Sequence, residues 1–159
     1  MGWSGQFSAQ VTEPDVVPVR VTAVHRARIQ ALGAMGAVDL IPASTLSTST
    51  VAVGDWVVAR DGVALRVLDR HSLVARKAAG SNVARQVIAA NLDALFIVSS
   101  CNADFNAGRM ERFLVLAASA GVEPVVVLTK ADTAENPGSF VTQAQALKSG
   151  LAVVLMDAK

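Results

Sequence analysis

The sequence has a single cysteine, Cys101, and only two histidines, His25 and His71. A lone cysteine excludes an intramolecular disulfide, and so few sulfur and nitrogen ligands argue against a zinc cluster. No histidine lies near Cys101 in the sequence to activate it, so we expect an inert thiol. Aromatic residues make up only 4% of the chain and tyrosine is absent, which argues against extensive stacking on nucleic-acid bases.

Long apolar runs and a secretory signal are also missing. No apolar stretch approaches the roughly 18 residues that span a bilayer, and residues 1–10 lack the basic start and apolar segment of a signal peptide. We therefore expect a cytoplasmic protein with no membrane partner. The 159 residues are 52% hydrophobic and 17% charged, which is enough apolar material for one medium or two small folded domains.

Charge is distributed unevenly along the chain. Residues 1–90 hold nine Arg and Lys against six Asp and Glu, a balance of +3, whereas residues 91–159 hold five against seven, a balance of −2. Basic residues gathered in one half favour a polyanionic partner such as RNA, because each neutralised phosphate releases counterions. An ordinary solvated surface is the competing interpretation. The candidate RNA contacts are six cationic residues: Arg26, Arg28, Arg70, Arg76, Lys77 and Arg85.

The first part of the chain carries short β-rich runs separated by turn residues. Asp61-Gly62, between the last two runs, is a tight hairpin signal. Five closely spaced strands fit a five-stranded Greek-key β-barrel of the OB-fold type, although an SH3-like barrel would give much the same pattern. We favour the OB-fold, over residues 1–70, with Trp56 in its core rather than stacked on a nucleotide. The predicted strands cover residues 16–24, 27–32, 37–41, 55–60 and 63–68.

Residues 71–90 are polar, basic and interrupted by Gly80-Ser81-Asn82, so they are predicted to form a linker that becomes helical toward residues 83–90. The pattern then changes. Residues 91–159 contain apolar runs at 95–98, 125–128 and 152–156.

These runs are continuous enough for strands covered on both faces of a parallel sheet. Helices are predicted between them, over residues 109–120 with a stop at Gly121, and over residues 139–149. Strand, helix, strand, helix, strand describes part of an α/β domain with right-handed crossovers.

The residues after the second apolar run carry the clearest chemical motif. Thr129-Lys130-Ala131-Asp132 matches the pattern of Asn or Thr, then Lys, any residue and Asp that recognises guanine in GTPases. Ligands of parallel sheets bind beyond the carboxyl ends of the strands, where this motif lies. An ionised Asp132 can accept hydrogen bonds from the ring N–H and the exocyclic amine of guanine, whereas adenine offers no such donor pair. Lys130 would lay its stem along the base and ribose, and Thr129 would hold the loop through its hydroxyl.

The third apolar run ends in Asp157-Ala158-Lys159, close to the Ser-Ala-Lys segment that completes guanine binding in GTPases, with Asp157 where serine is usual. The phosphate-binding loop, Gly-x-x-x-x-Gly-Lys followed by Ser or Thr, is absent, because none of the four lysines follows a glycine. Either the guanine motif is a coincidence, or the domain is circularly permuted and its phosphate loop comes after residue 159.

These residues resemble a known family, the circularly permuted, ribosome small-subunit-dependent GTPases, in which a β-barrel comes first and guanine recognition precedes phosphate binding. The string from Gln86 to Asp93 is the most specific piece. The resemblance covers most of the chain, through Val53-Gly54-Asp55-Trp56-Val57, residues 86–93, residues 105–114 and residues 124–132.

The resemblance implies a GTP hydrolase that assists late maturation of the small ribosomal subunit, with the OB-fold on ribosomal RNA. The implied GTP contacts are Thr129, Lys130, Ala131, Asp132, Asp157, Ala158 and Lys159. Mg²⁺ and Zn²⁺ are implied for the full-length family, with sites absent from this chain. We therefore expect the N-terminal part of an enzyme, a truncated P-loop GTPase-type domain that is inactive alone and self-associates through an exposed sheet edge. The alternative is a non-enzymatic RNA-binding OB-fold module with an α/β scaffold.

Overall fold

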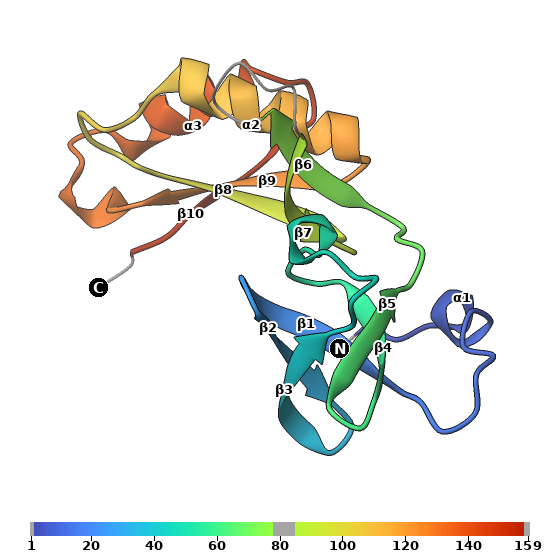
Figure 1. The fold of residues 1–159 in the computed structure, drawn as a ribbon. Helices are drawn as coiled ribbons and strands as arrows, with labels where there is room; N and C mark the ends of the chain where they lie inside the picture. The colour runs from blue at the N-terminus through green and yellow to red at the C-terminus, as the bar shows by residue number, and fades with distance from the viewer. Residues whose placement is uncertain (1, 78–84, 158–159) are drawn as a thin grey trace. The chain divides into compact units, whose positions relative to one another are not determined.

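The computed structural model describes residues 2–77 and 85–157, which form two compact units divided between Leu92 and Asp93 (Figure 1). In unit 1, five strands close a barrel in the order β1-β2-β3-β5-β4. The predicted five-stranded barrel is confirmed, and each strand bound differs from the predicted one by at most one residue. The strands are β1 (Val17–His25), β2 (Arg28–Gly33), β3 (Gly36–Pro42), β4 (Trp56–Arg60) and β5 (Val63–Val67).

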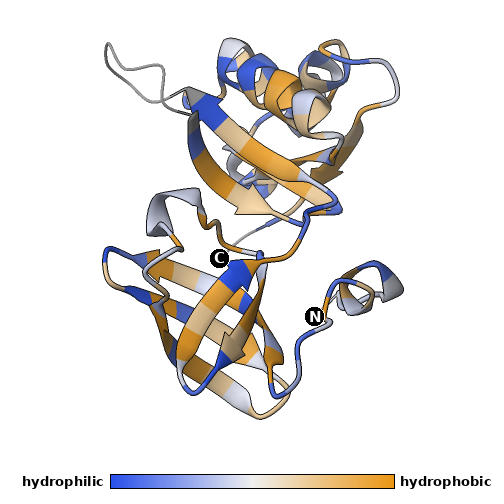
Figure 2. Cartoon of the chain, turned by 45° about the vertical axis from the view of Figure 1, so that its right-hand side comes forward, coloured by the Kyte–Doolittle hydropathy of each residue, from blue (hydrophilic) through white to orange (hydrophobic). Residues whose placement is uncertain are grey.

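Alternation along the strands builds the barrel core. In β2, Ile29 and Ala31 are buried while Gln30 between them is exposed, because successive side chains of a strand point to opposite faces. The same alternation appears in Figure 2 as orange and blue bands along the barrel strands. The buried residues form one core: Val19, Val21, Ile29, Ala31, Leu40, Val51, Val57, Ala59 and Ala64.

A short N-terminal helix, α1 (Gly5–Ser8), covers a second apolar cluster. Its Phe7 is buried with Trp56, at a ring-centroid separation of 6.0 Å, and Trp3 meets Trp56 edge-on at 4.7 Å. Trp56 is only 2% exposed, so the prediction of a core role is confirmed. The sequence did not indicate α1, because four residues are too few to show a helical period.

The segment predicted as a linker folds into a hairpin of β6 (Leu73–Lys77) and β7 (Arg85–Ala90), which pair antiparallel. The expectation of a helix toward residue 90 is wrong for residues 85–90. Val87 and Ile88 are β-branched, which favours a strand. Pairing with β6 also satisfies the backbone N–H and C=O groups of this segment, which a solvated linker would expose to water. Gly80-Ser81-Asn82, on which the linker interpretation rested, lies outside the described residues.

The hairpin returns to the barrel at Gly54 and Asn91. Ala90 N donates to Val53 O at 2.9 Å, and Asn91 Nδ2 donates to Gly54 O at 3.1 Å. Arg20 Nη2 donates to Asn91 O at 2.9 Å. Gly54 has a φ of +89°, and a Cβ at this position would collide with Ala90 O. Both the backbone angle and the close approach therefore require glycine here.

Unit 2 is a three-stranded parallel sheet in the order β10-β9-β8 with two helices. The predicted partial α/β sheet is confirmed. Asn106 caps the first helix by accepting from Arg109 N at 2.8 Å, and Gly121, at a φ of 65°, ends it as predicted. The elements are β8 (Ala94–Ser100), α2 (Ala107–Ala120), β9 (Glu123–Thr129), α3 (Pro137–Gln145) and β10 (Ala152–Leu155). Among the described residues, no helix is long and apolar enough to cross a membrane.

Only one face of this sheet is covered by the described part of unit 2. Ile97, Val126 and Leu128 share a core with Met110 and Leu114 of α2. On the opposite face Phe96 and Val98 are 65% and 62% exposed. The expectation that the strands are covered on both faces is therefore wrong for these residues, because α2 and α3 contribute to the same core cluster.

Replacing Gly54 with alanine should destabilise unit 1 by about 2 kcal/mol or more, because strain at positive φ adds to overlap with Ala90 O. Gly62→Ala is the matched control, since Gly62 has a φ of +77° but no atom within 4 Å of an added Cβ; it should cost about 1 kcal/mol. Both tryptophans lie in unit 1, so urea unfolding followed by tryptophan fluorescence reports this unit. Equal losses for the two variants would contradict the close-approach explanation.

Candidate nucleotide-recognition site

The loop that follows β9 has an uncommon backbone conformation. Lys130 adopts φ 57° and ψ 35°, and the next three residues form a 3₁₀ turn, Ala131–Thr133. A left-handed conformation costs a residue with a side chain about 1–2 kcal/mol. Such strain gathers at binding and catalytic sites, where the surrounding structure imposes it. The motif singled out in the sequence thus coincides with a locally strained turn.

Neighbouring strands hold the start of this loop from both sides. The Thr129 hydroxyl donates to Ser99 O of β8 at 3.2 Å, and Cys101 N donates to Thr129 O at 2.9 Å. On the other side, Met156 N donates to Leu128 O at 2.9 Å, which continues the β9–β10 pairing past the last residue of β10. Parallel pairing therefore brings the ends of all three strands to one rim of the sheet.

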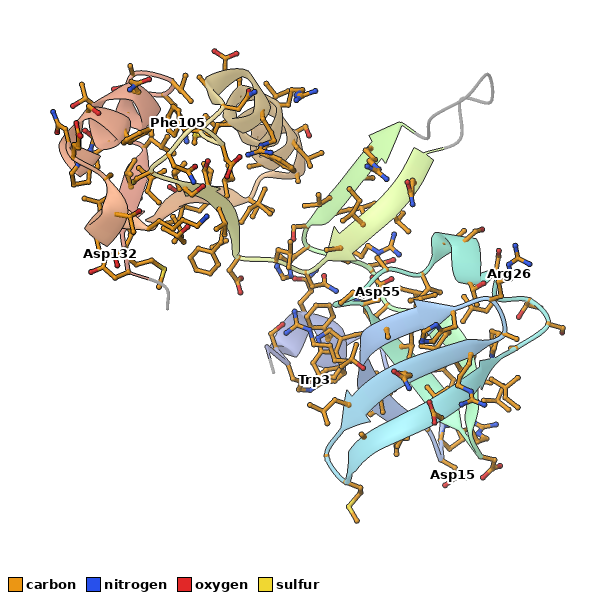
Figure 3. The ribbon with its side chains drawn as sticks, turned by 90° about the vertical axis from the view of Figure 1, so that its left-hand side faces the viewer. Trp3, Asp15, Arg26, Asp55, Phe105 and Asp132 are labelled. Atoms are coloured by element: carbon orange, nitrogen blue, oxygen red, sulfur yellow. The ribbon has the colours of Figure 1, made fainter. Side chains whose placement is uncertain are left out.

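The Asp132 side chain is exposed at this rim, and Figure 3 shows it on the loop after β9. Across residues 2–77 and 85–157, none donates a hydrogen bond to its carboxylate. Its backbone N–H donates to Asp157 Oδ1 at 3.0 Å. Lys130 is also exposed, and Thr129 and Ala131 are half-buried. The structure thus brings Thr129, Lys130, Ala131, Asp132 and Asp157 together, whereas Ala158 and Lys159 lie outside the described residues.

Five of the six candidate RNA contacts fall at two places. Arg26 and Arg28 are exposed at the β1–β2 turn, where Arg28 Nη1 lies 3.8 Å from Asp39 Oδ2 in a solvent-exposed pair. Arg76 is exposed near the end of the β6–β7 hairpin and donates from Nε to Gln86 Oε1 at 3.1 Å. Lys77 and Arg85 stand opposite each other in the same hairpin, and Figure 2 shows this end in blue, next to the grey trace.

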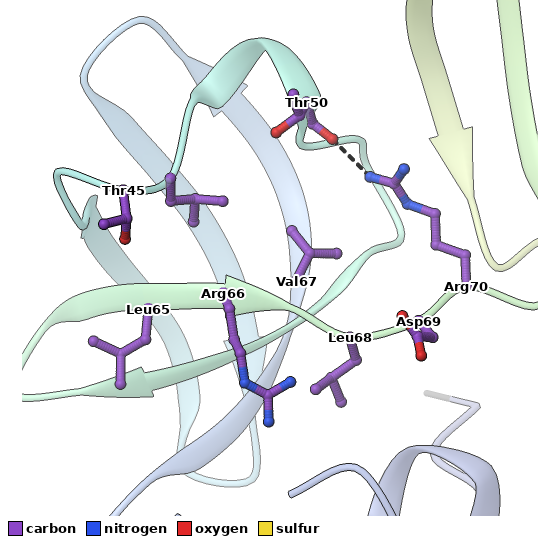
Figure 4. A pocket seen from close by; sticks show the side chains of 9 residues that line it. Thr45, Thr50, Leu65, Arg66, Val67, Leu68, Asp69 and Arg70 are labelled. Atoms are coloured by element: carbon purple, nitrogen blue, oxygen red, sulfur yellow. Dashed lines mark hydrogen bonds between the residues drawn. The ribbon is translucent and has the colours of Figure 1, made fainter.

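Arg70 has a different environment from the other candidates. Its Nε donates to Asp55 Oδ1 at 2.6 Å and its Nη2 donates to Asp55 Oδ2 at 2.7 Å. Nη2 also donates to Thr50 O at 2.7 Å (Figure 4). Asp55 is completely buried. The hydrogen bonds from the Arg70 guanidinium to this carboxylate raise the pKa of Arg70 above its usual value. The side chain therefore neutralises a buried charge inside unit 1.

The groove beside β5 in Figure 4 is lined by Arg66 as well as Arg70. Arg66 donates from Nε and Nη2 to Glu13 at 2.8 and 3.0 Å, and these bonds lower the pKa of Glu13 to about 2. Glu13 is therefore ionised at neutral pH and ties the N-terminal segment to β5. Both arginines that line the groove already have carboxylate partners, so the exposed Arg26 and Arg76 are better candidates for phosphate contacts.

Two contributions to these sites were not foreseen from the sequence. Ser99 anchors Thr129 through its backbone carbonyl, and a backbone contact leaves no mark on residue identity. Asp55 was noted only within a family motif, and its burial with Arg70 joins positions 15 residues apart. The sequence offers only a weak signal for this ion pair: an Asp stands just before one strand, and an Arg follows the hairpin that the strand begins.

The described part of the chain contains neither a cluster of metal ligands nor an activated thiol. Residues 2–77 and 85–157 contain no group of three or more His, Cys, Asp or Glu that could hold a metal ion. They therefore do not fit the Mg²⁺ or the Zn²⁺ that the family implies, and no step involves either ion here. Cys101 is buried, and burial raises the pKa of its thiol. A raised pKa disfavours the reactive thiolate, consistent with an inert side chain.

A five-stranded barrel followed by a parallel sheet, with the Thr-Lys-Ala-Asp motif at its rim, defines a class: an OB-fold protein that carries part of a GTPase-type domain. Residues 67–159 match the family model described as RsgA GTPase. The chain belongs to this family, which confirms the resemblance inferred from the sequence.

Known relatives are longer than this chain. It is 45% identical to the small ribosomal subunit biogenesis GTPase RsgA of Mesorhizobium japonicum, over 99% of this chain and 46% of the relative. It is also 45% identical to the RsgA 2 protein of Vibrio parahaemolyticus, over 92% of this chain and 42% of that one. The chain thus spans about half the length of the curated relatives that it matches.

The fold also matches a solved structure. The crystal structure of YjeQ from Thermotoga maritima superposes with a TM-score of 0.65 at 21% sequence identity, over 89% of this chain and 52% of that chain. At this identity the match concerns the fold alone. It supports the barrel and the parallel sheet as they are described above.

Proposed function

We propose that this chain is the RNA-binding and guanine-recognising part of a cytoplasmic GTP hydrolase that assists late maturation of the small ribosomal subunit. The observation that carries the proposal is the exposed Asp132 carboxylate, which has no donor among the described residues and lies at the ligand-binding rim of a parallel sheet. The relatives named small ribosomal subunit biogenesis GTPase support it.

The base is recognised by complementary hydrogen bonding. Two carboxylate oxygens of Asp132 accept from the ring N–H and the exocyclic amine of guanine, a donor pair that adenine lacks. The exposed Lys130 covers the base with its aliphatic stem. Thr129 holds the loop to β8, Ala131 contributes from the rim, and Ala158 and Lys159 are proposed as further GTP contacts. GTP is therefore selected over ATP by the loop after β9.

Hydrolysis needs more than these residues provide. A triphosphate is gripped by backbone N–H groups of a glycine-rich loop and its lysine, and no lysine of this sequence follows a glycine. Phosphate binding and catalysis therefore need a glycine-rich loop and a lysine that this sequence does not contain. This chain alone should bind guanine nucleotides weakly and turn over no GTP.

The test is a nuclear magnetic resonance titration with nucleoside monophosphates, which carry the base and need no triphosphate grip. GMP should shift the amide resonances of Lys130 and Asp132, whereas AMP should not. Asp132→Asn should weaken GMP binding about tenfold or more, because one accepting oxygen becomes a donor. The same variant should gain a response to xanthosine monophosphate, whose base offers one donor and one acceptor at this edge.

Glu111→Gln is the matched control for loss of a carboxylate, since Glu111 is exposed on α2, and it should leave both responses unchanged. Equal responses of the wild-type chain to GMP and AMP would contradict guanine recognition. They would favour the second function, a non-enzymatic RNA-binding OB-fold module whose α/β portion is a scaffold.

RNA binding is proposed for unit 1, on the exposed cations at the β1–β2 turn and the hairpin end. Arg26→Gln should weaken binding of a short ribosomal RNA hairpin and lower the slope of log affinity against log salt by about one, because one phosphate contact is lost. Arg60→Gln removes the same charge, but its guanidinium donates to the carbonyl oxygens of Pro14 and Asp15. The control should leave the slope unchanged. Salt-insensitive RNA binding would contradict this electrostatic account.

Self-association is proposed through the open side of unit 2. β8 is an edge strand of the described sheet, and its exposed face carries Phe96 and Val98, with Val154 of β10 49% exposed in the same face. An unpaired edge beside exposed apolar side chains is a template for association with another copy.

Phe96→Lys should therefore shift the chain toward the monomer, measured as mass by light scattering over a dilution series. Val115→Lys is the control, because Val115 is also exposed, at 69%, but lies on α2; it should leave the mass unchanged. A wild-type chain that is monomeric at every concentration would overturn the proposal.

A further inference from the structure

The turn that carries Asp132 lacks a cap of its own. The first N–H groups of a helical turn have no partner within the turn and need an external acceptor. Lys130 occupies the N-cap position of Ala131–Thr133 and makes no side-chain capping bond, since a lysine side chain has no acceptor. The acceptor comes instead from Asp157, whose Oδ1 receives the Asp132 N–H at 3.0 Å.

The sheet places this acceptor from 25 residues away. Leu155 is paired with Leu128, and Met156 N donates to Leu128 O at 2.9 Å. The chain after β10 is therefore held against the end of β9, and Asp157 arrives beside the turn. The Asp157 oxygen supplies the acceptor that the turn lacks, so this hydrogen bond restrains the turn.

We propose that Asp157 is a positioning residue for guanine recognition, holding the Asp132 amide so that the Asp132 carboxylate is pre-ordered to read the base. This role rests on the function proposed above and differs from a direct contact with GTP. One oxygen of Asp157 is occupied by the backbone N–H, while the Asp132 carboxylate stays open to solvent. The two carboxylates thus have separate tasks, one toward the loop and one toward the ligand.

The experiment compares Asp157→Ala and Asp157→Asn in the full chain, with GMP as the probe. The alanine has no acceptor, so GMP binding should weaken by about fivefold or more, and the Asp132 amide proton should move upfield. The asparagine keeps an accepting oxygen without the charge, so its affinity should stay within about twofold of wild type. Asp157 is exposed and follows the last strand, and unchanged resonances of the Ile97 and Val126 core would verify folding in each variant.

The possible results separate the two proposals. An Asp157→Ala chain that binds GMP as tightly as wild type would overturn the positioning role. So would an Asp157→Asn chain as weak as the alanine variant, because that result would assign the effect to the charge rather than to the hydrogen bond. Failure of the wild-type chain to distinguish GMP from AMP would instead contradict guanine recognition itself.

Discussion

Unit 1 depends on one buried carboxylate and the guanidinium that neutralises it. Asp55 is completely buried, and its oxygens accept from Ala52 N and from two nitrogens of Arg70, which also bonds Thr50 O. A buried charge without its partner costs several kcal/mol. The pair therefore fixes the turn before β4 and the point after β5 where the chain leaves the barrel. The close approach of Gly54 to Ala90 follows from that fixed turn.

Unit 2 depends on register rather than on charge. Parallel pairing sets Ser100 against Thr129, and Leu128 against Leu155, so the three strands end at one level. A shift of β10 by one residue would move Asp157 away from the Asp132 amide and turn its side chain to the other face. The geometry of the loop after β9 therefore depends on the register of the sheet.

The barrel strands and the end of α2 at Gly121 were predictable because their signals are local, whereas α3 (Pro137–Gln145) ends four residues before the predicted residue 149. Period-two alternation, Asp61-Gly62 and the glycine after α2 each act within a few residues. The β6–β7 hairpin was not predictable in this way, because its pairing joins residues that are separated by a polar stretch. At the candidate site, the sequence motif predicted the residues Thr129 to Asp132. The apolar run before them predicted that they lie at the end of a strand. The hydrogen bond from Asp132 to Asp157 needed the register, which no local pattern contains.

Comparing the entropic cost of ordering the loop with the free energy of base recognition explains why such a loop should be ordered before a ligand binds. Fixing the backbone costs about 1–2 kcal/mol per residue, so ordering Lys130 to Thr133 on binding would cost roughly 4–8 kcal/mol. Two hydrogen bonds from guanine to a carboxylate contribute about 3–6 kcal/mol, which is comparable to that cost. Base reading would therefore leave little net free energy if the loop were ordered only on binding. The bonds from Thr129 to Ser99 and from Asp132 to Asp157 order the loop when the chain folds. Under the proposed function, the free energy of base recognition would then remain available for specificity.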